Sequence, residues 1–188
     1  MTEQLPTKEW IKQHYQHAVE AVGSSGVLPE VLLGQAILES QRSGKMPGSV
    51  LAREHNNYFG IKASKAWPGK SVNMKTKEYY RQSDIPAEIR DTFKVYPTVL
   101  DSFQDYVKFL QQPRYKKALQ MKTAEGQAAV IHAAGYATDP NYSEKLSAVA
   151  RIVSKIAEAA QLIKKHSVGA GAIILLFAAG FGLYKYSK

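Results

Sequence analysis

The sequence predicts an α+β domain that is mostly helical, with one small β-hairpin lobe, followed by a C-terminal transmembrane helix. Three observations support this prediction. Apolar residues recur at helical spacing through most of the chain. Two segments, 71–80 and 89–96, instead alternate between apolar and polar residues, which is typical of half-buried strands. Near the end, residues 168–184 contain no charged side chain.

Length and composition indicate one folded domain with a short appendage. A chain of 188 residues has room for one domain with a proper core. Hydrophobic residues make up 45% and charged residues 22%, which are ordinary proportions for a folded protein and exclude wholesale disorder. We therefore expect one domain over residues 1–163 and a C-terminal membrane anchor over residues 164–188.

The charge and the metal-binding residue types restrict the possible partners. Lys and Arg number 25 against 16 Asp and Glu, and the net charge of +9 favours an anionic partner. Acidic lipid and cell-wall polymer qualify, whereas a nucleic-acid partner is not expected because no clustered basic and aromatic stretch is present. The absence of cysteine excludes disulfides and thiolate catalysis. The five histidines form no H-E-x-x-H motif, so no metal or cofactor is expected.

The first half of the chain predicts two helices and a long loop. Apolar residues from Trp10 to Val22 recur at helical spacing, and the sequence G-S-S-G stops that helix. Pro29 suits the first position of the second helix, which we expect to end near Ser43. Residues 45–69 are rich in glycine, proline and asparagine, which predicts a loop.

The second half predicts a hairpin and then helices. Segments 71–80 and 89–96 form the hairpin, and Thr98 with Asp101 makes a capping box for the next helix, which Pro113 ends. A short helix at 114–119 and an alanine-rich one at 124–134 follow, and Gly135 breaks the pattern. The last helix follows Asn141, with these residues predicted to face inward: Leu146, Val149, Ile152, Val153, Ile156 and Ala160.

The C-terminal segment predicts a membrane-spanning helix. As a helix, residues 168–184 would be about 25 Å long, close to the thickness of a bilayer core, and lysines lie on both sides of it. A buried core helix is the alternative. Ala178 and Gly182 are small residues four apart, which is compatible with self-association of two tails. The N-terminus has no classical secretion signal, so a phage virion membrane or a bacterial cell envelope is the expected location.

Four short motifs carry the candidate chemistry. They are G-Q-A-I-L-E-S (34–40), N-N-Y-F-G-I-K-A-S (56–64), T-K-E-Y (76–79) and A-G-Y-A-T-D-P-N-Y (134–142). Glu39 is the second-last residue of the first motif, among apolar neighbours and in the last turn of a predicted helix. Desolvation and the negative end of the helix dipole both raise the pKa of a carboxyl group. A carboxyl with a raised pKa suits proton donation to a glycosidic oxygen. A solvated glutamate at a helix end is the alternative.

The order and wording of these motifs resemble glycoside hydrolase family 73, the peptidoglycan-cleaving endo-β-N-acetylglucosaminidases. That family includes the muralytic domain of the flagellar rod-cap hydrolase. The resemblance spans about residues 27–147 and implies a lysozyme-like fold and a glycan-strand substrate. Family members usually have Gly-Trp where this chain has Gln41 and Arg42, which removes one contact expected to stack on a sugar.

The resemblance also implies roles for individual residues. Glu39 corresponds to the general acid, and Glu78 to a base or a residue that positions water. Tyr136 corresponds to a tyrosine that faces the catalytic glutamate. Asn57 and Tyr58 fall in the motif that lines the sugar cleft. Trp67, outside the motifs, could be a further stacking platform or a wedge between lobes.

Two alternative functions remain open at this point. A lytic transglycosylase would share the fold and Glu39 but would not need Glu78 to manage water. A structural or peptidoglycan-binding virion protein with weak or no catalysis is the other alternative. Product analysis would separate hydrolysis from transglycosylation.

Overall fold

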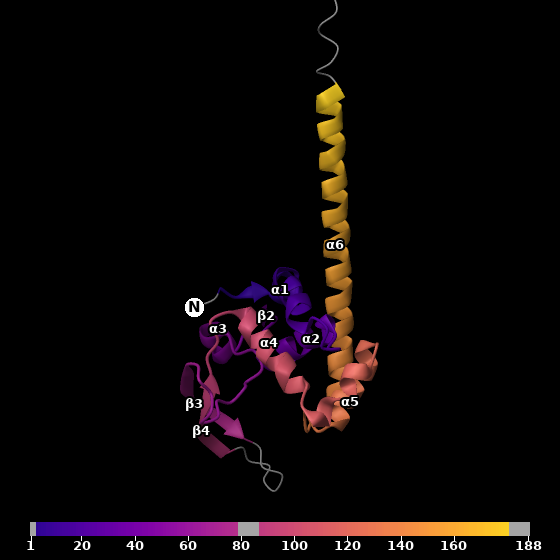
Figure 1. The fold of residues 1–188 in the computed structure, drawn as a ribbon. Coiled ribbons are helices and arrows are strands. Elements are labelled where there is room, and N and C mark those ends of the chain that lie inside the picture. Colours follow the sequence, from indigo (N-terminus) through magenta and orange to yellow (C-terminus); the bar gives the residue numbers. More distant parts are fainter. Residues whose placement is uncertain (1–2, 79–86, 181–188) are drawn as a thin grey trace, which may run out of the picture.

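The computed structural model describes residues 3–78 and 87–180, which fold into a helical lobe with a β-hairpin at one side (Figure 1). The mostly helical α+β prediction is confirmed. In chain order the elements are β1 (Leu5–Pro6), α1 (Thr7–Val22), α2 (Pro29–Ser40), β2 (Lys45–Met46), α3 (Val50–His55), β3 (Ser71–Glu78), β4 (Ala87–Lys94), α4 (Val99–Leu110), the 3-10 helices η1 (Pro113–Tyr115) and η2 (Ala118–Gln120), α5 (Ala124–Ala133) and α6 (Tyr142–Gly180).

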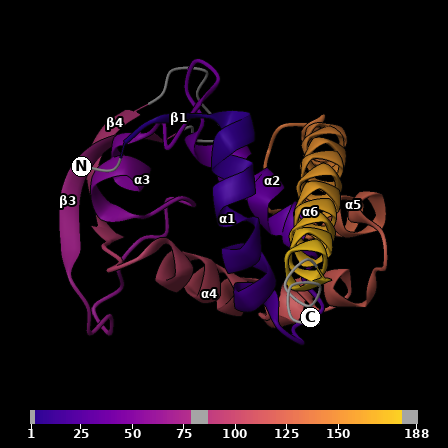
Figure 2. The same ribbon diagram turned by 90° about the horizontal axis from the view of Figure 1, so that it is seen from above.

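Helix α2 is the centre of the helical lobe. It lies between α1 and α6 and also contacts α5 (Figure 2). Its sequence is apolar on almost every side, and all residues from Val31 to Ile37 are buried. Gly34 allows the close approach of α6, because a Cβ atom at this position would lie 3.0 Å from Cδ1 of Leu146. A helix that is apolar all round belongs in a core, and α2 thereby fixes the position of the carboxylate at its end.

The β-hairpin is attached to the helical lobe by the segment that follows α3. Strands β3 and β4 are antiparallel, with Ser71 opposite Lys94 and Glu78 opposite Ala87. The backbone of β4 also pairs with the preceding segment, since Ala63 N donates to Thr92 O at 2.8 Å and Lys94 N donates to Ile61 O at 3.0 Å. The predicted hairpin is therefore confirmed, and the motif at 56–64 forms its connection to the helices.

Two features differ from the sequence predictions. The predicted loop at 45–69 contains β2, which pairs with β1, and the short helix α3, which the Ser49 side chain caps by accepting from Ala52 N at 3.2 Å. Ile152 was predicted to face the core but is 55% exposed. Its neighbours Ala150 and Val153 are fully buried, so α6 presents a narrower apolar face than its sequence suggests.

The C-terminal segment continues α6 as one helix to Gly180. Within residues 3–78 and 87–180, the helices do not combine the length and apolar character needed to cross a bilayer. The predicted transmembrane helix is thus not found in the described part of the chain. Residues 181–184, which end the predicted span, lie outside the described residues.

Candidate active site

Glu39 projects from the last turn of α2 into solvent. The helix ends here because the backbone of Gln41 is extended, at ψ 142°, after its N–H makes the last helical bond, to Ile37 O at 2.9 Å. The buried Ser40 hydroxyl donates to Ala36 O at 2.7 Å. Ile37 and Ser40 are buried, whereas the Glu39 side chain is exposed. The core helix therefore holds one carboxylate at the surface in a fixed position.

The carboxyl of Glu39 is electrostatically unusual for an exposed group. Desolvation by the surrounding protein raises its pKa, and interactions with the Tyr136 hydroxyl and with the charge of Arg42 offset part of this rise. Exposure and desolvation together are the properties of a group in a concave surface, which solvent reaches from one side only. A carboxyl in this setting can hold a proton closer to neutral pH than an ordinary glutamate.

Tyr136 lies beside Glu39 and closes the helical side of the site. Gly135, at φ 77°, ends the turn after α5 and directs the chain so that the Tyr136 ring packs on Tyr142, with centroids 5.3 Å apart, and on Tyr106 at 6.2 Å. Burial raises the pKa of Tyr136 well above its ordinary value, and the charge of Glu39 acts in the same direction. The hydroxyl therefore stays protonated and is available as a hydrogen-bond donor.

Sequence reasoning missed a group of buried polar residues behind this pair. Gln35, one turn before Glu39 on α2, donates from Nε2 to the Tyr142 hydroxyl at 3.1 Å. Within the described residues, Gln35 Oε1 and the Tyr106 hydroxyl are buried without a hydrogen-bond partner. The charge of Glu39 raises the pKa of both Tyr106 and Tyr142, after burial as the main cause. The one signal in the sequence was a glutamine inside an otherwise apolar helix.

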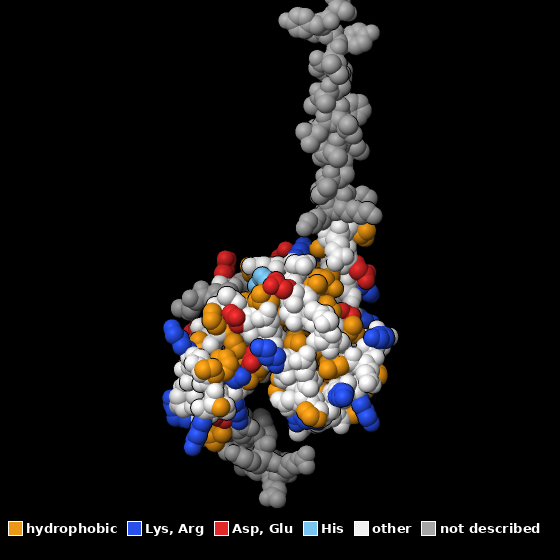
Figure 3. Space-filling view, in the orientation of Figure 1, with side chains coloured by type: hydrophobic (Ala, Val, Ile, Leu, Met, Phe, Trp, Pro, Cys, Tyr) orange, Lys and Arg blue, Asp and Glu red, His pale blue; other side chains and the backbone are white. Residues whose placement is uncertain are grey.

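A pocket of about 530 Å³ lies next to Tyr136, which is large enough for a sugar unit. Its walls come from the helical lobe and from the base of the hairpin, and Figure 3 shows the surface hollowed where the two lobes meet. The lining combines aromatic rings with hydroxyl, amide and amine groups. The lining residues are Phe59, Gly60, Ile61, Lys62, Ser64, Lys94, Tyr106, Phe109, Gln112 and Tyr136.

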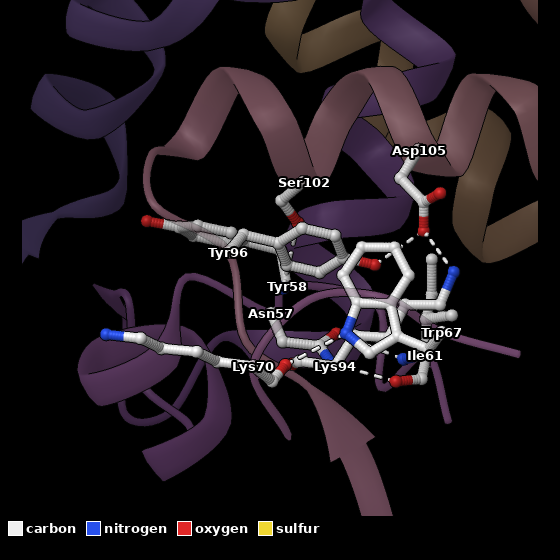
Figure 4. Close-up of polar contacts among 9 residues, drawn as sticks. All are labelled: Asn57, Tyr58, Ile61, Trp67, Lys70, Lys94, Tyr96, Ser102 and Asp105. Atoms are coloured by element: carbon white, nitrogen blue, oxygen red, sulfur yellow. Dashed lines mark hydrogen bonds and ion pairs between the residues drawn. The ribbon is translucent and has the colours of Figure 1, made fainter. Parts of the chain in front are cut away.

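Two predicted sugar contacts are buried. Asn57 is 1% exposed, and its Nδ2 donates to Ile61 O at 3.0 Å and to Lys94 O at 2.9 Å, while its Oδ1 accepts from Ile61 N at 3.0 Å (Figure 4). Tyr58 is also 1% exposed and packs against Trp10 and Phe103. Both side chains face the interior in this structure and shape the segment that lines the pocket. Their contact with the substrate stays a prediction.

The other two predicted residues lie elsewhere. Glu78 ends β3, where its backbone pairs with Ala87, and its side chain lies outside the described part of the structure. Trp67 lies in the loop before β3 and is half-buried. It is absent from the lining of the pocket beside Tyr136 and lines a different pocket. The structure therefore brings together Glu39 and Tyr136 among the predicted catalytic residues.

Side chains suited to a metal ion are not gathered in the described ranges. Across residues 3–78 and 87–180, no group of three or more histidine, cysteine or acidic side chains could hold one. His14 and His17 do face each other on α1, with their Nδ1 atoms 3.1 Å apart. Burial, followed by the charge of His17, lowers the pKa of His14 to about 4. The imidazole of His14 is therefore neutral near pH 7.

Comparison with known sequences finds relatives named as a peptidoglycan hydrolase and as a glucosaminidase. The Vibrio parahaemolyticus protein named peptidoglycan hydrolase FlgJ is 39% identical over 132 residues, which cover 69% of this chain and 42% of that protein. The exo-glucosaminidase LytG of Bacillus subtilis is 33% identical over 129 residues, covering 65% of this chain and 43% of that protein. The chain thus spans less than half the length of these relatives.

Comparison with solved structures agrees with the sequence comparison. The glycoside hydrolase domain of Salmonella typhimurium FlgJ superposes with a TM-score of 0.66 at 29% identity, covering 89% of this chain and 99% of that domain. The catalytic domain of the Listeria monocytogenes autolysin Auto gives a TM-score of 0.68 at 28% identity, covering 84% and 90%. A family model described as mannosyl-glycoprotein endo-beta-N-acetylglucosaminidase matches residues 15–155. The motifs, the fold and this match together establish that the chain belongs to the glucosaminidase family, glycoside hydrolase family 73.

Proposed function

We propose that this chain is a peptidoglycan hydrolase that cleaves the β-1,4 glycosidic bond of the glycan strand as an N-acetylglucosaminidase, with Glu39 as general acid. The main support is the environment of Glu39. Its carboxyl has a raised pKa and interacts with Tyr136, and Tyr136 lines a pocket of sugar size. The names of the relatives support peptidoglycan as the substrate class and a glucosaminidase activity.

The proposed reaction uses Glu39 in its protonated form. The carboxyl donates its proton to the glycosidic oxygen as the bond to the anomeric carbon breaks, so that the leaving sugar departs as a neutral alcohol. Glu39 is then a carboxylate. A hydrogen bond from the Tyr136 hydroxyl and the nearby charge of Arg42 favour this charged form. These groups keep the pKa of Glu39 from rising so far that the proton would not be released.

The positive centre left on the sugar requires a second group. Glu78 is our candidate, either as a base that activates water or as a residue that positions it, because the T-K-E-Y strand resembles the corresponding family motif. The acetamido group of the substrate could serve instead, as in substrate-assisted glycoside hydrolases. In either case the anomeric carbon that carried the positive charge gains a hydroxyl from water.

Glu78→Gln and Tyr136→Phe should each lower kcat on peptidoglycan, but by less than loss of the acid. Tyr136→Phe should also move the alkaline limb of the pH–rate profile to higher pH. Its hydroxyl lowers the pKa of Glu39, so its removal raises that pKa and keeps the acid protonated further into the alkaline range. Unchanged rates in both variants would leave Glu39 acting alone and favour the transglycosylase.

The function itself is tested by digestion of purified peptidoglycan. We expect the unmodified protein to release soluble muropeptides from insoluble sacculi in the absence of added metal or cofactor. Proteinase-treated and heat-inactivated protein serve as controls. A protein that binds sacculi but releases no fragments would contradict the enzyme and favour a binding or structural role.

We further propose that the C-terminal segment attaches the enzyme to a bilayer, in a virion or in a cell envelope. The support is the sequence, since residues 168–184 contain no charge and lysines flank them. The full chain should co-sediment with lipid vesicles, whereas a chain ending at His166 should remain in the supernatant and still cut peptidoglycan. A full chain that stays out of the vesicle pellet would refute the anchor. A truncated chain that fails to fold would instead make the segment part of the core.

A further inference from the structure

A second pocket lies at the base of the hairpin and has a volume of about 600 Å³. It shares no lining residue with the pocket beside Tyr136. Its wall is mostly apolar and includes an indole ring, a phenol ring and two proline rings, with a single charged residue. The lining residues are Trp67, Pro68, Gly69, Lys70, Val95, Tyr96 and Pro97.

The indole ring of Trp67 is held rigidly along one edge. Its Nε1 donates to Lys70 O at 2.9 Å (Figure 4). Gly69 packs on the same edge, because a Cβ atom there would lie only 2.6 Å from Cζ2 and 3.0 Å from Nε1 of the ring. The N–H group is therefore already used inside the protein. What Trp67 offers to the pocket is apolar ring surface rather than a hydrogen bond.

Two elements of the fold brace the ring from other sides. The amine of Lys94 lies 4.3 Å from the ring centroid, and it pairs with Asp105 of α4 at 2.9 Å. Asp105 also accepts from the Tyr96 hydroxyl at 2.6 Å, and the Tyr96 ring meets Trp67 edge to face at 5.9 Å. A ligand that binds this ring does not have to order it first, which favours binding.

The chemistry of the wall suits a sugar. An aromatic face stacks on the apolar C–H face of a pyranose, while the hydroxyls of the sugar stay in water. The pocket also adjoins the candidate active site, because Lys94 lines the pocket beside Tyr136 and lies over the ring of Trp67. One extended polymer could therefore occupy both.

We propose that the Trp67 pocket is a distal glycan subsite, which holds a sugar unit of the same strand beyond the units bound next to Glu39. The proposal rests on the proposed function, since it takes the polymeric glycan as the ligand. A subsite at this position gives a reason for the contacts that hold the half-buried Trp67 against Lys94 of β4 and, through it, Asp105 of α4. Trp67 does not line the pocket beside Tyr136. Such a subsite would favour long strands over short fragments.

The first test measures kcat/KM as a function of substrate length. Trp67→Ala should lower kcat/KM on peptidoglycan and on long chito-oligosaccharides by about tenfold, the effect of losing one aromatic contact, and leave the shortest cleaved oligomer unaffected. Trp67→Phe, which keeps an aromatic ring, should recover most of the loss. An equal effect at all lengths, or no effect at any length, would overturn the subsite.

The second test uses the fluorescence of Trp67 to detect the ligand. The chain has two tryptophans, and Trp10 is 1% exposed, so a ligand-induced change in emission reports Trp67. In the Glu39→Gln variant, long chito-oligosaccharides should shift the emission spectrum, and the additional Trp67→Phe change should remove that shift. Binding without a spectral change would contradict the proposal. If the protein cuts peptidoglycan but the emission of Trp67 does not change, the subsite is contradicted and the hydrolase is not. If the emission changes but peptidoglycan is not cut, the hydrolase is contradicted and the binding of glycan at Trp67 is not.

Discussion

Replacing Glu39 with glutamine is expected to abolish peptidoglycan cleavage while leaving the fold intact. Glutamine has the same shape but cannot donate the proton, and loss of a general acid costs roughly 10²- to 10⁴-fold in rate. In the unmodified protein, activity should fall as pH rises through the raised pKa of Glu39, because only the protonated carboxyl is the acid. Release of muropeptides over a range of pH measures both effects.

The matched control for this variant is Glu30→Gln, which makes the same chemical change in the first turn of the same helix. It should retain activity.

The stability of Glu39→Gln gives an independent check, because the sign of the effect is defined. Burial raises the folded-state pKa of Glu39, so its charge destabilises the fold above the unfolded-state pKa, and this cost disappears in acid. Glu39→Gln should therefore not lower Tm near neutral pH. If Glu39→Gln kept near-parental turnover, Glu39 would not be the general acid.

Replacing Asn57 with alanine is expected to cause the largest loss of stability among these changes. Its side chain makes three hydrogen bonds to the backbone of Ile61 and Lys94. Alanine would remove the side-chain partner of Ile61 N and Lys94 O, whereas Ile61 O would keep its bond from Lys94 N. We expect a cost of about 3 kcal/mol in the free energy of unfolding. Chemical denaturation measures this quantity. Activity of Asn57→Ala should also be lower at denaturant concentrations at which the variant is still folded. The reason is that the segment held by Asn57 lines the pocket beside Tyr136.

Asn73→Ala is the control for Asn57→Ala. Asn73 is an exposed residue of β3, and its side chain bonds to Thr92 and Arg90 on the surface of the hairpin. Its loss should change the free energy of unfolding by less than about 0.5 kcal/mol. If the two variants were equally stable, the hydrogen bonds from Asn57 to Ile61 and Lys94 would not be what holds the hairpin to the helices. Asn57 could then be reconsidered as a contact for the substrate.

Local signals predicted most of the fold. The hairpin followed from alternation, and the start of α4 from its capping box, in which Thr98 and Asp101 bond reciprocally as expected. Strands β1 and β2 and helix α3 were missed because a two-residue pairing and a six-residue helix are too short to show a period. The exposure of Ile152 was missed because the apolar pattern of α6 is wider than its buried face.

The site was less predictable because it depends on contacts between distant residues. Glu39 could be identified locally, from apolar neighbours and its place at a helix end. The bond from Gln35 to Tyr142 joins residues 107 positions apart, and that from Asn57 to Lys94 joins residues 37 apart. Periodicity within one element carries no information about either contact. For the same reason, the motif around Asn57 and Tyr58 did not reveal that both side chains point into the protein.

The sugars at the new chain ends show which linkage of the glycan strand is cut and whether it is cut by hydrolysis. Peptidoglycan digested by the unmodified protein is reduced with borohydride, and the terminal sugars are identified by mass spectrometry. We expect reduced N-acetylglucosamine at the new ends, since hydrolysis by an N-acetylglucosaminidase leaves this sugar with a free reducing group. Anhydro-sugar ends would show transglycosylation and contradict hydrolysis, and reduced N-acetylmuramic acid would place the cut at the other linkage of the strand.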